Sequence, residues 1–132
     1  MKTAPILITK LDAARRQLDT AIQLFFSSGD FVSIHALSFA AYTITRNLCD
    51  KTENEATLMK FVCARIEEHQ HAEFARCLNK AGNYFKHADR DPQETLEYIP
   101  EQYDVFIITA IWQYQALTGE MTMPMHVYRY GI

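Results

Sequence analysis

The sequence predicts an all-α protein, a single-domain bundle of four to five helices that spans residues 1–132. Apolar residues recur at helical spacing through most of the chain, whereas the strict alternation typical of half-buried strands is scarce. With 132 residues, of which 48% are hydrophobic, the chain can bury one core without disulfides. No repeat or linker divides it, so we expect one domain.

A start signal and a stop signal bound the first helix. Thr9 and Asp12 have the spacing of a capping box, in which each side chain accepts a hydrogen bond from the backbone N–H of the other residue. The helix should end at the polar sequence SSGD, residues 27–30. Its expected core face carries Leu11, Leu18, Ile22 and Phe25.

The second helix should start after Asp30, which can cap it, and run to about Leu48. Its sequence, FVSIHALSFAAYTI, is apolar on nearly every side, which places it at the centre of the bundle or against a partner subunit. His35 lies within it. We expect a buried histidine that pairs with a hydroxyl or a carboxylate, and the alternative is a histidine that faces a ligand in a pocket.

A helical pattern then continues from Asn54 to about His87, which is longer than a small domain usually contains. We therefore expect a break or kink near EEHQH, residues 67–71. The dipeptide Asp91-Pro92 should end the run, because proline disfavours helical geometry in the residue before it.

The last helix should begin at Pro100, since proline suits the first helical position, and should stop around Thr118 and Gly119. The tail, about residues 120–132, shows no clear period and is expected to be an irregular arm. Because the second and last helices are apolar around most of their circumference, we expect a homodimer to cover what one small bundle leaves exposed.

Composition excludes several classes of protein. A formal charge of −3 argues against whole-protein attraction to nucleic acid or anionic membrane, so such binding would need a local patch. Three cysteines without a CxxC pair suggest reduced thiols buried in a cytoplasmic protein. No segment approaches the roughly 20 apolar residues that span a bilayer. There is no glycine-rich phosphate loop, so no cofactor is expected.

The sequence RCLNKAGNYFKHADRD supplies the candidate binding surface. Wound as one helix, it would align five polar residues on one stripe, with apolar residues opposite. The stripe consists of Arg76, Lys80, Asn83, His87 and Arg90, and the opposite face of Phe74, Leu78, Ala81, Phe85 and Ala88. The cations could hold phosphate oxygens while His87 acts as a catalytic acid or base. The alternative is a solvated face, with His87 interacting with the helix C-terminus.

The same segment carries a resemblance. NYFKHADRDP, preceded by RCLNKAG and taken with LDAARRQLDTAIQLFFSSGDFVSIHALSFAAY, resembles an uncharacterised bacterial family of small helical proteins, and the asparagine-to-histidine stretch resembles HEPN-like helical bundles. HEPN nucleases resemble one another chiefly by an arginine that precedes a histidine by a short spacing. The matching position before His87 holds Lys80, whereas Arg65 and His71 satisfy the spacing. The resemblance thus implies a fold more directly than it implies nuclease activity.

Metal binding is a weaker alternative. Glu68 and His71 form an ExxH pair, which would place two ligands on one helical face, but no second such pair exists. We therefore expect no metal site, and an exposed hinge at this sequence.

These observations favour a binding or regulatory protein over an enzyme. The first hypothesis is a homodimeric module whose stripe contacts RNA, a nucleotide or an acidic partner. The rivals are a metal-independent, HEPN-like ribonuclease that uses His87, and a purely structural interaction protein.

Overall fold

The computed structural model describes residues 3–131, which form helices and connections without a strand. The predicted all-α, single-domain bundle is confirmed. Its elements are α1 (Lys10–Phe26), α2 (Phe31–Lys51), α3 (Leu58–Cys63), the 3₁₀ turn η1 (Glu68–Gln70), α4 (His71–Tyr84), the 3₁₀ turn η2 (Pro100–Gln102), α5 (Tyr103–Thr118) and α6 (Met123–Tyr130).

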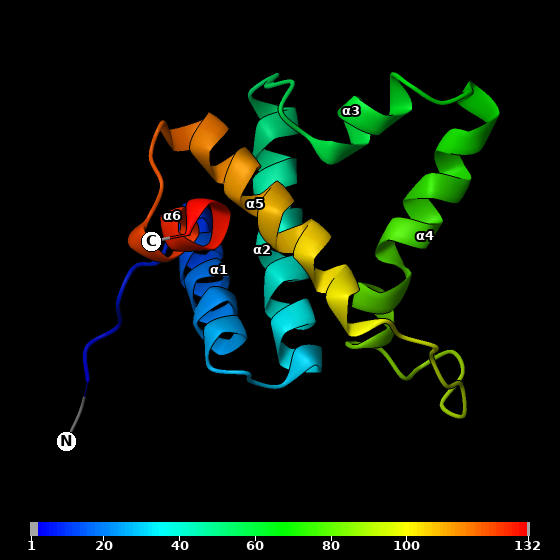
Figure 1. Ribbon diagram of the computed structural model, residues 1–132, viewed down its shortest axis with the longest axis horizontal. Helices are drawn as coiled ribbons and strands as arrows, with labels where there is room; N and C mark the ends of the chain where they lie inside the picture. Colours follow the sequence, from blue (N-terminus) through cyan, green and yellow to red (C-terminus); the bar gives the residue numbers. More distant parts are fainter. Residues whose placement is uncertain (1–2, 132) are drawn as a thin grey trace.

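The core lies where α1, α2 and α5 meet, and α2 packs against both of the others (Figure 1). The expected central position of the second helix is therefore confirmed. Burial of a large apolar side chain contributes roughly 1.5–3 kcal/mol each, which is the main stabilisation of such a core. Its fully buried aliphatic side chains include Leu18, Ile22, Ile34, Ile107 and Ile111.

The predicted helix boundaries hold where capping signals set them. In the capping box of α1, Thr9 Oγ1 accepts from the Asp12 N–H at 3.0 Å, and Asp12 Oδ2 accepts from the Thr9 N–H at 3.3 Å. Asp30 caps α2 by accepting from the Ser33 N–H at 2.9 Å. At the other end of the chain, α5 stops at Gly119, whose φ of 75° is the left-handed geometry that glycine tolerates.

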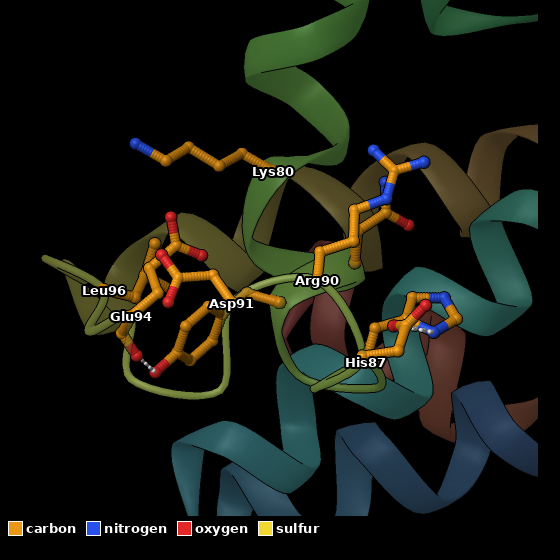
Figure 2. Close-up of a pocket in the computed structure, with 9 residues that line it drawn as sticks. Lys80, His87, Arg90, Asp91, Glu94 and Leu96 are labelled. Atoms are coloured by element: carbon orange, nitrogen blue, oxygen red, sulfur yellow. Dashed lines mark hydrogen bonds and ion pairs between the residues drawn. The ribbon is translucent and has the colours of Figure 1, made fainter.

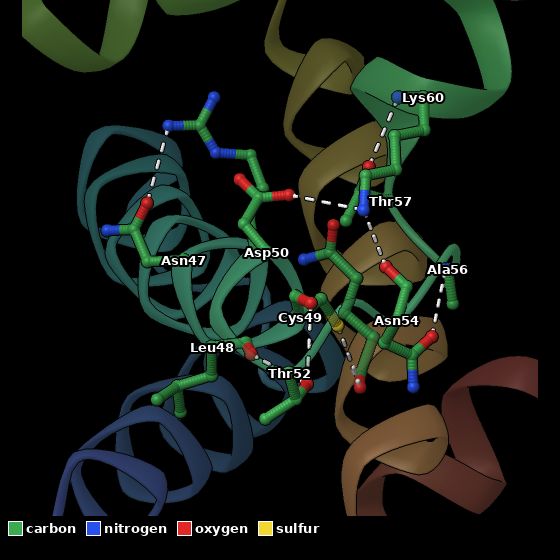
Figure 3. Close-up of polar contacts among 11 residues, drawn as sticks. Asn47, Leu48, Cys49, Asp50, Thr52, Asn54, Ala56, Thr57 and Lys60 are labelled. Carbon is green, nitrogen blue, oxygen red and sulfur yellow. Dashed lines mark hydrogen bonds and ion pairs between the residues drawn. The ribbon is translucent and has the colours of Figure 1, made fainter.

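Polar contacts anchor the connection between α2 and α3 to the core (Figure 3). Asn54 Nδ2 donates to the Ala116 carbonyl of α5 at 3.3 Å, and Lys60 Nζ donates to the Asn54 carbonyl at 2.9 Å. Lys60 Nζ also lies 3.7 Å from Asp50 Oδ1. These contacts fix the direction in which the chain leaves the bundle.

The expected break in the long helical run is also confirmed. The helix stops at Cys63 and resumes at His71, with η1 between them. As a result α3 and α4 lie on the far side of α2 and α5 from α1 and α6 (Figure 1). Only Ala81 and Gly82 of α4 are buried, both near its C-terminal end.

One boundary prediction is wrong, because α4 ends at Tyr84 and not at Asp91-Pro92. Packing overrides helical propensity here. The Phe85 ring turns towards the core and contacts the rings of His35 and Tyr98, with centroids 5.3 Å away in each case. Tyr84 Oη donates to the Glu94 carbonyl at 2.8 Å, which ties the following loop back to the helix end.

The predicted irregular arm over about residues 120–132 is also wrong, because most of it forms α6. Thr122 caps this helix and donates to Asp19 Oδ1 of α1 at 2.6 Å. Met125 is fully buried in the core. A helix of eight residues is too short to show a clear period, so its polar start at Thr122 and its end at Gly131 were the usable signals.

The cysteines are free thiols, as expected, but they are not all buried. Cys49 is buried, Cys63 is half-buried and Cys77 is exposed, with its thiol 3.4 Å from Glu73 Oε1. Within residues 3–131, no helix combines the length and the apolar character that crossing a bilayer requires.

Candidate binding cleft

A cleft of about 540 Å³ opens at the C-terminal end of α4 (Figure 2). One wall is the last turn of the helix and the other is the loop that follows it, over residues 85–96. Most of its lining residues carry a polar or charged group, and they are Lys80, Asn83, Tyr84, His87, Asp89, Arg90, Asp91, Glu94 and Leu96.

Four of the five predicted stripe residues line this cleft, although the stripe as a helical feature does not exist. Lys80 and Asn83 belong to α4, whereas His87 and Arg90 lie in the loop beyond its end. Arg76 is the exception, because it lies outside the cleft and forms an ion pair with Glu73. The apolar face is also shorter than expected, since Ala88 is exposed.

The cleft carries both signs of charge. Lys80 and Arg90 share its lining with three carboxylates, those of Asp89, Asp91 and Glu94. Figure 2 shows Lys80 on the side of Asp91 and Glu94, and His87 on the other side. Neither Lys80 nor Arg90 has an ion-pair partner within 4.0 Å among residues 3–131, so both cations are available to a ligand.

His87 is placed as a solvent-facing group. Its side chain is 60% exposed, and Nδ1 lies 3.9 Å from Asp89 Oδ1. A catalytic acid or base needs to reach a bound substrate proton, and one carboxylate neighbour would orient the imidazole for this. His87 is therefore free to contact an anion. No second histidine is among the residues that line the cleft.

Both residues of the HEPN-like spacing pair, Arg65 and His71, make contacts with nearby residues of the chain. The Arg65 guanidinium lies over the Phe61 ring, 3.7 Å from its centroid, and donates to the Phe61 carbonyl. His71 Nε2 is hydrogen-bonded to the Cys63 carbonyl at 2.9 Å. Local contacts therefore engage both side chains.

The two residues of the ExxH pair lie in different elements. Glu68 lies in η1 and His71 starts α4, and the imidazole is committed to the Cys63 carbonyl. The described part of the chain, residues 3–131, holds no group of three or more His, Cys, Asp or Glu residues placed to bind a metal ion.

His35 is a core residue, in agreement with the first of the two interpretations of it. Its side chain is fully buried, and Nδ1 is hydrogen-bonded to the Tyr98 hydroxyl at 2.8 Å. Burial among aromatic rings lowers the pKa of His35 from 6.5 to about 4, because the charged form would lose its hydration. The histidine is therefore neutral at pH 7.

Sequence reasoning missed the acidic wall of the cleft. Asp89 and Asp91 flank Arg90 in the chain, and both carboxylates were visible as a charge pattern. The prediction grouped residues by their angular position on one continuous helix. Residues beyond the end of the helix have no such position, so the two carboxylates were given no role.

Comparison with known proteins found no match: no family model, no curated protein and no solved structure is similar to the chain at a significant level.

Proposed function

We propose that this is a binding protein whose cleft receives a protein segment that carries both positive and negative side chains. One observation carries the proposal: three carboxylates and two cations that have no ion-pair partner among residues 3–131 line the same cleft of about 540 Å³. The partner's acidic side chains would contact Lys80 and Arg90, and its basic side chains would contact Asp91 and Glu94.

Charge favours such a partner over RNA. Apart from His87, the cleft is lined by two basic and three acidic side chains, so an extended polyanion would meet net repulsion from them. A segment with alternating charge could pair its acidic side chains with the cations of the cleft and its basic side chains with the carboxylates. Arginine adds geometric selectivity, because its guanidinium can bind a carboxylate through two parallel hydrogen bonds.

The rival function is cleavage of RNA by a HEPN-like bundle. The position of His87 beside Asp89 favours it, since that carboxylate could orient the imidazole. The engaged positions of Arg65 and His71 argue against it. A third class, a purely structural interaction protein, would use none of these charges.

We also propose a cytoplasmic location, because the three free thiols would stay reduced there.

Fluorescence anisotropy of the full chain tests the proposal with two labelled probes, an alternating Glu–Lys peptide and oligouridylate. We expect saturable peptide binding that weakens as salt is added. Loss of one exposed ion pair changes the dissociation constant by about two- to fivefold, which is the effect expected of Lys80→Ala and of Arg90→Ala.

Arg76→Ala is the matched control, because Arg76 is an exposed cation on the same helix but lies outside the cleft. It should bind the peptide like the unmodified chain. The proposal is wrong if Arg76→Ala and Lys80→Ala weaken binding equally, if the peptide does not bind, or if oligouridylate binds more tightly. Cleavage of oligouridylate that His87→Ala abolishes would establish the rival.

A further inference from the structure

An apolar groove lies between α1 and α6, remote from the charged cleft. Its volume is about 440 Å³ and its wall is almost entirely apolar. Met123 at its rim is 73% exposed, and Phe26 is also exposed. The groove is lined by Ile22, Gln23, Phe26, Ser27, Met123, Pro124 and Val127.

The N-terminal segment of the same chain is apolar but is not packed against the bundle. Residues 3–9, the N-terminal arm, are not part of any helix, and Figure 1 shows the arm leading away from α1. Its three consecutive aliphatic residues, Ile6, Leu7 and Ile8, are all exposed, and Leu7 is 98% exposed. Leaving such side chains in water forgoes the stabilisation that burial would give.

The aliphatic residues of the arm cannot reach the groove of their own chain along α1. An extended residue spans at most about 3.5 Å, so Ile6 stays within about 10 Å of Thr9. The groove residues of α1 start at Ile22, about 20 Å along the helix from Thr9 at a rise of 1.5 Å per residue. Even if the arm folded back along α1, its aliphatic residues Ile6, Leu7 and Ile8 would stop about 10 Å short of Ile22.

We propose that the arm of a second copy occupies the groove, so that two chains exchange arms in a symmetric homodimer. Each chain offers one apolar arm and one apolar groove that it cannot join internally, and a twofold arrangement satisfies both pairs at once. The groove could accommodate aliphatic side chains such as those of Ile6 and Leu7. This inference is independent of the charged cleft.

Analytical ultracentrifugation of the full chain across micromolar to millimolar concentrations tests the proposal. We expect a monomer–dimer equilibrium. Leu7→Glu should weaken dimerisation by about tenfold or more, because it would place an unpaired carboxylate in an apolar groove. Met123→Glu, which changes the groove and not the arm, should weaken dimerisation to a similar extent. Both residues are exposed within one chain, so neither change should disturb folding.

Ile6→Glu and Ile99→Glu form a matched pair, since the two isoleucines are 69% and 71% exposed and only Ile6 lies in the arm. Ile99→Glu should leave the dimer intact. A mixture of Leu7→Glu and Met123→Glu chains should form more dimer than either variant alone, because one unmodified arm then meets one unmodified groove. The proposal is overturned if the unmodified chain is a monomer at every concentration. It is also overturned if Leu7→Glu or Met123→Glu dimerises like the unmodified chain, or if the mixture forms no more dimer than either variant alone.

Discussion

The aromatic ring of Phe39 packs directly against the backbone of Gly82, and a Cβ atom on residue 82 would overlap that ring. Gly82 therefore lets α4 approach α2 closely at the one place where α4 is buried. This contact positions the end of α4, and with it the wall of the charged cleft.

Gly82→Ala should destabilise the protein although alanine is the better helix former. Overpacking costs about 1–3 kcal/mol, and the helical propensity of alanine offsets ~1 kcal/mol of it. Urea denaturation measures the change in the free energy of unfolding. The cost should shrink in a Phe39→Leu background, which leaves room for the added methyl group. A gain in stability from Gly82→Ala alone would contradict the close packing.

The sequence predicted the fold well where local signals decide it. The capping residues Thr9 and Asp30 and the stop at Gly119 gave correct boundaries, because hydrogen bonds within a few residues set them. It failed at Tyr84, where contacts of Phe85 with His35 and Tyr98 end the helix. Those partners are far away in the chain, so no local pattern reports them.

The candidate site was predicted in composition but not in geometry. Lys80, Asn83, His87 and Arg90 do gather, yet they do so around a loop and opposite carboxylates. The prediction treated them as a cationic helix face. Arg76, which a continuous helix would include, lies elsewhere.

Acid should destabilise the protein through His35. The pKa of this histidine is about 4 in the folded chain and 6.5 when exposed, so between these values only the unfolded chain binds the proton. Stability present above pH 6.5 is therefore lost as the pH falls towards 4, by up to roughly 3 kcal/mol. Urea denaturation at a series of pH values measures it.

His35→Phe is the comparison variant, since it removes the titrating group and keeps an aromatic ring in the cluster. Its free energy of unfolding should fall less between pH 6.5 and pH 4 than that of the unmodified chain. Identical pH dependence in the two proteins would show that His35 is not held neutral by burial.

The three thiols should react at different rates with a disulfide reagent. Cys77 is exposed and should react first, followed by the half-buried Cys63. Burial raises the pKa of Cys49 and also blocks access, so Cys49 should react only as the chain unfolds. Mass spectrometry of labelled peptides gives the order. Equal rates at Cys49 and Cys77 would contradict the packing of α2 against α5.

Thr122→Val should loosen α6 and change the titration of Asp19. Burial raises the pKa of Asp19, and the hydrogen bond from Thr122 partly counteracts this rise. Without the hydroxyl, the pKa of Asp19 should rise further, and loss of the cap should cost about 1 kcal/mol. Carboxyl NMR titration follows Asp19 directly. Thr122→Ser keeps the hydroxyl and should leave both quantities near their original values.

An NMR titration of the isotope-labelled full chain with the alternating Glu–Lys peptide tests most directly whether the cleft at the end of α4 binds segments of mixed charge. We predict saturable shifts that concentrate in residues 80–96, with the amides around Arg76 unaffected. Shifts spread evenly over the surface, confined to the groove between α1 and α6, or absent at saturating peptide would contradict it.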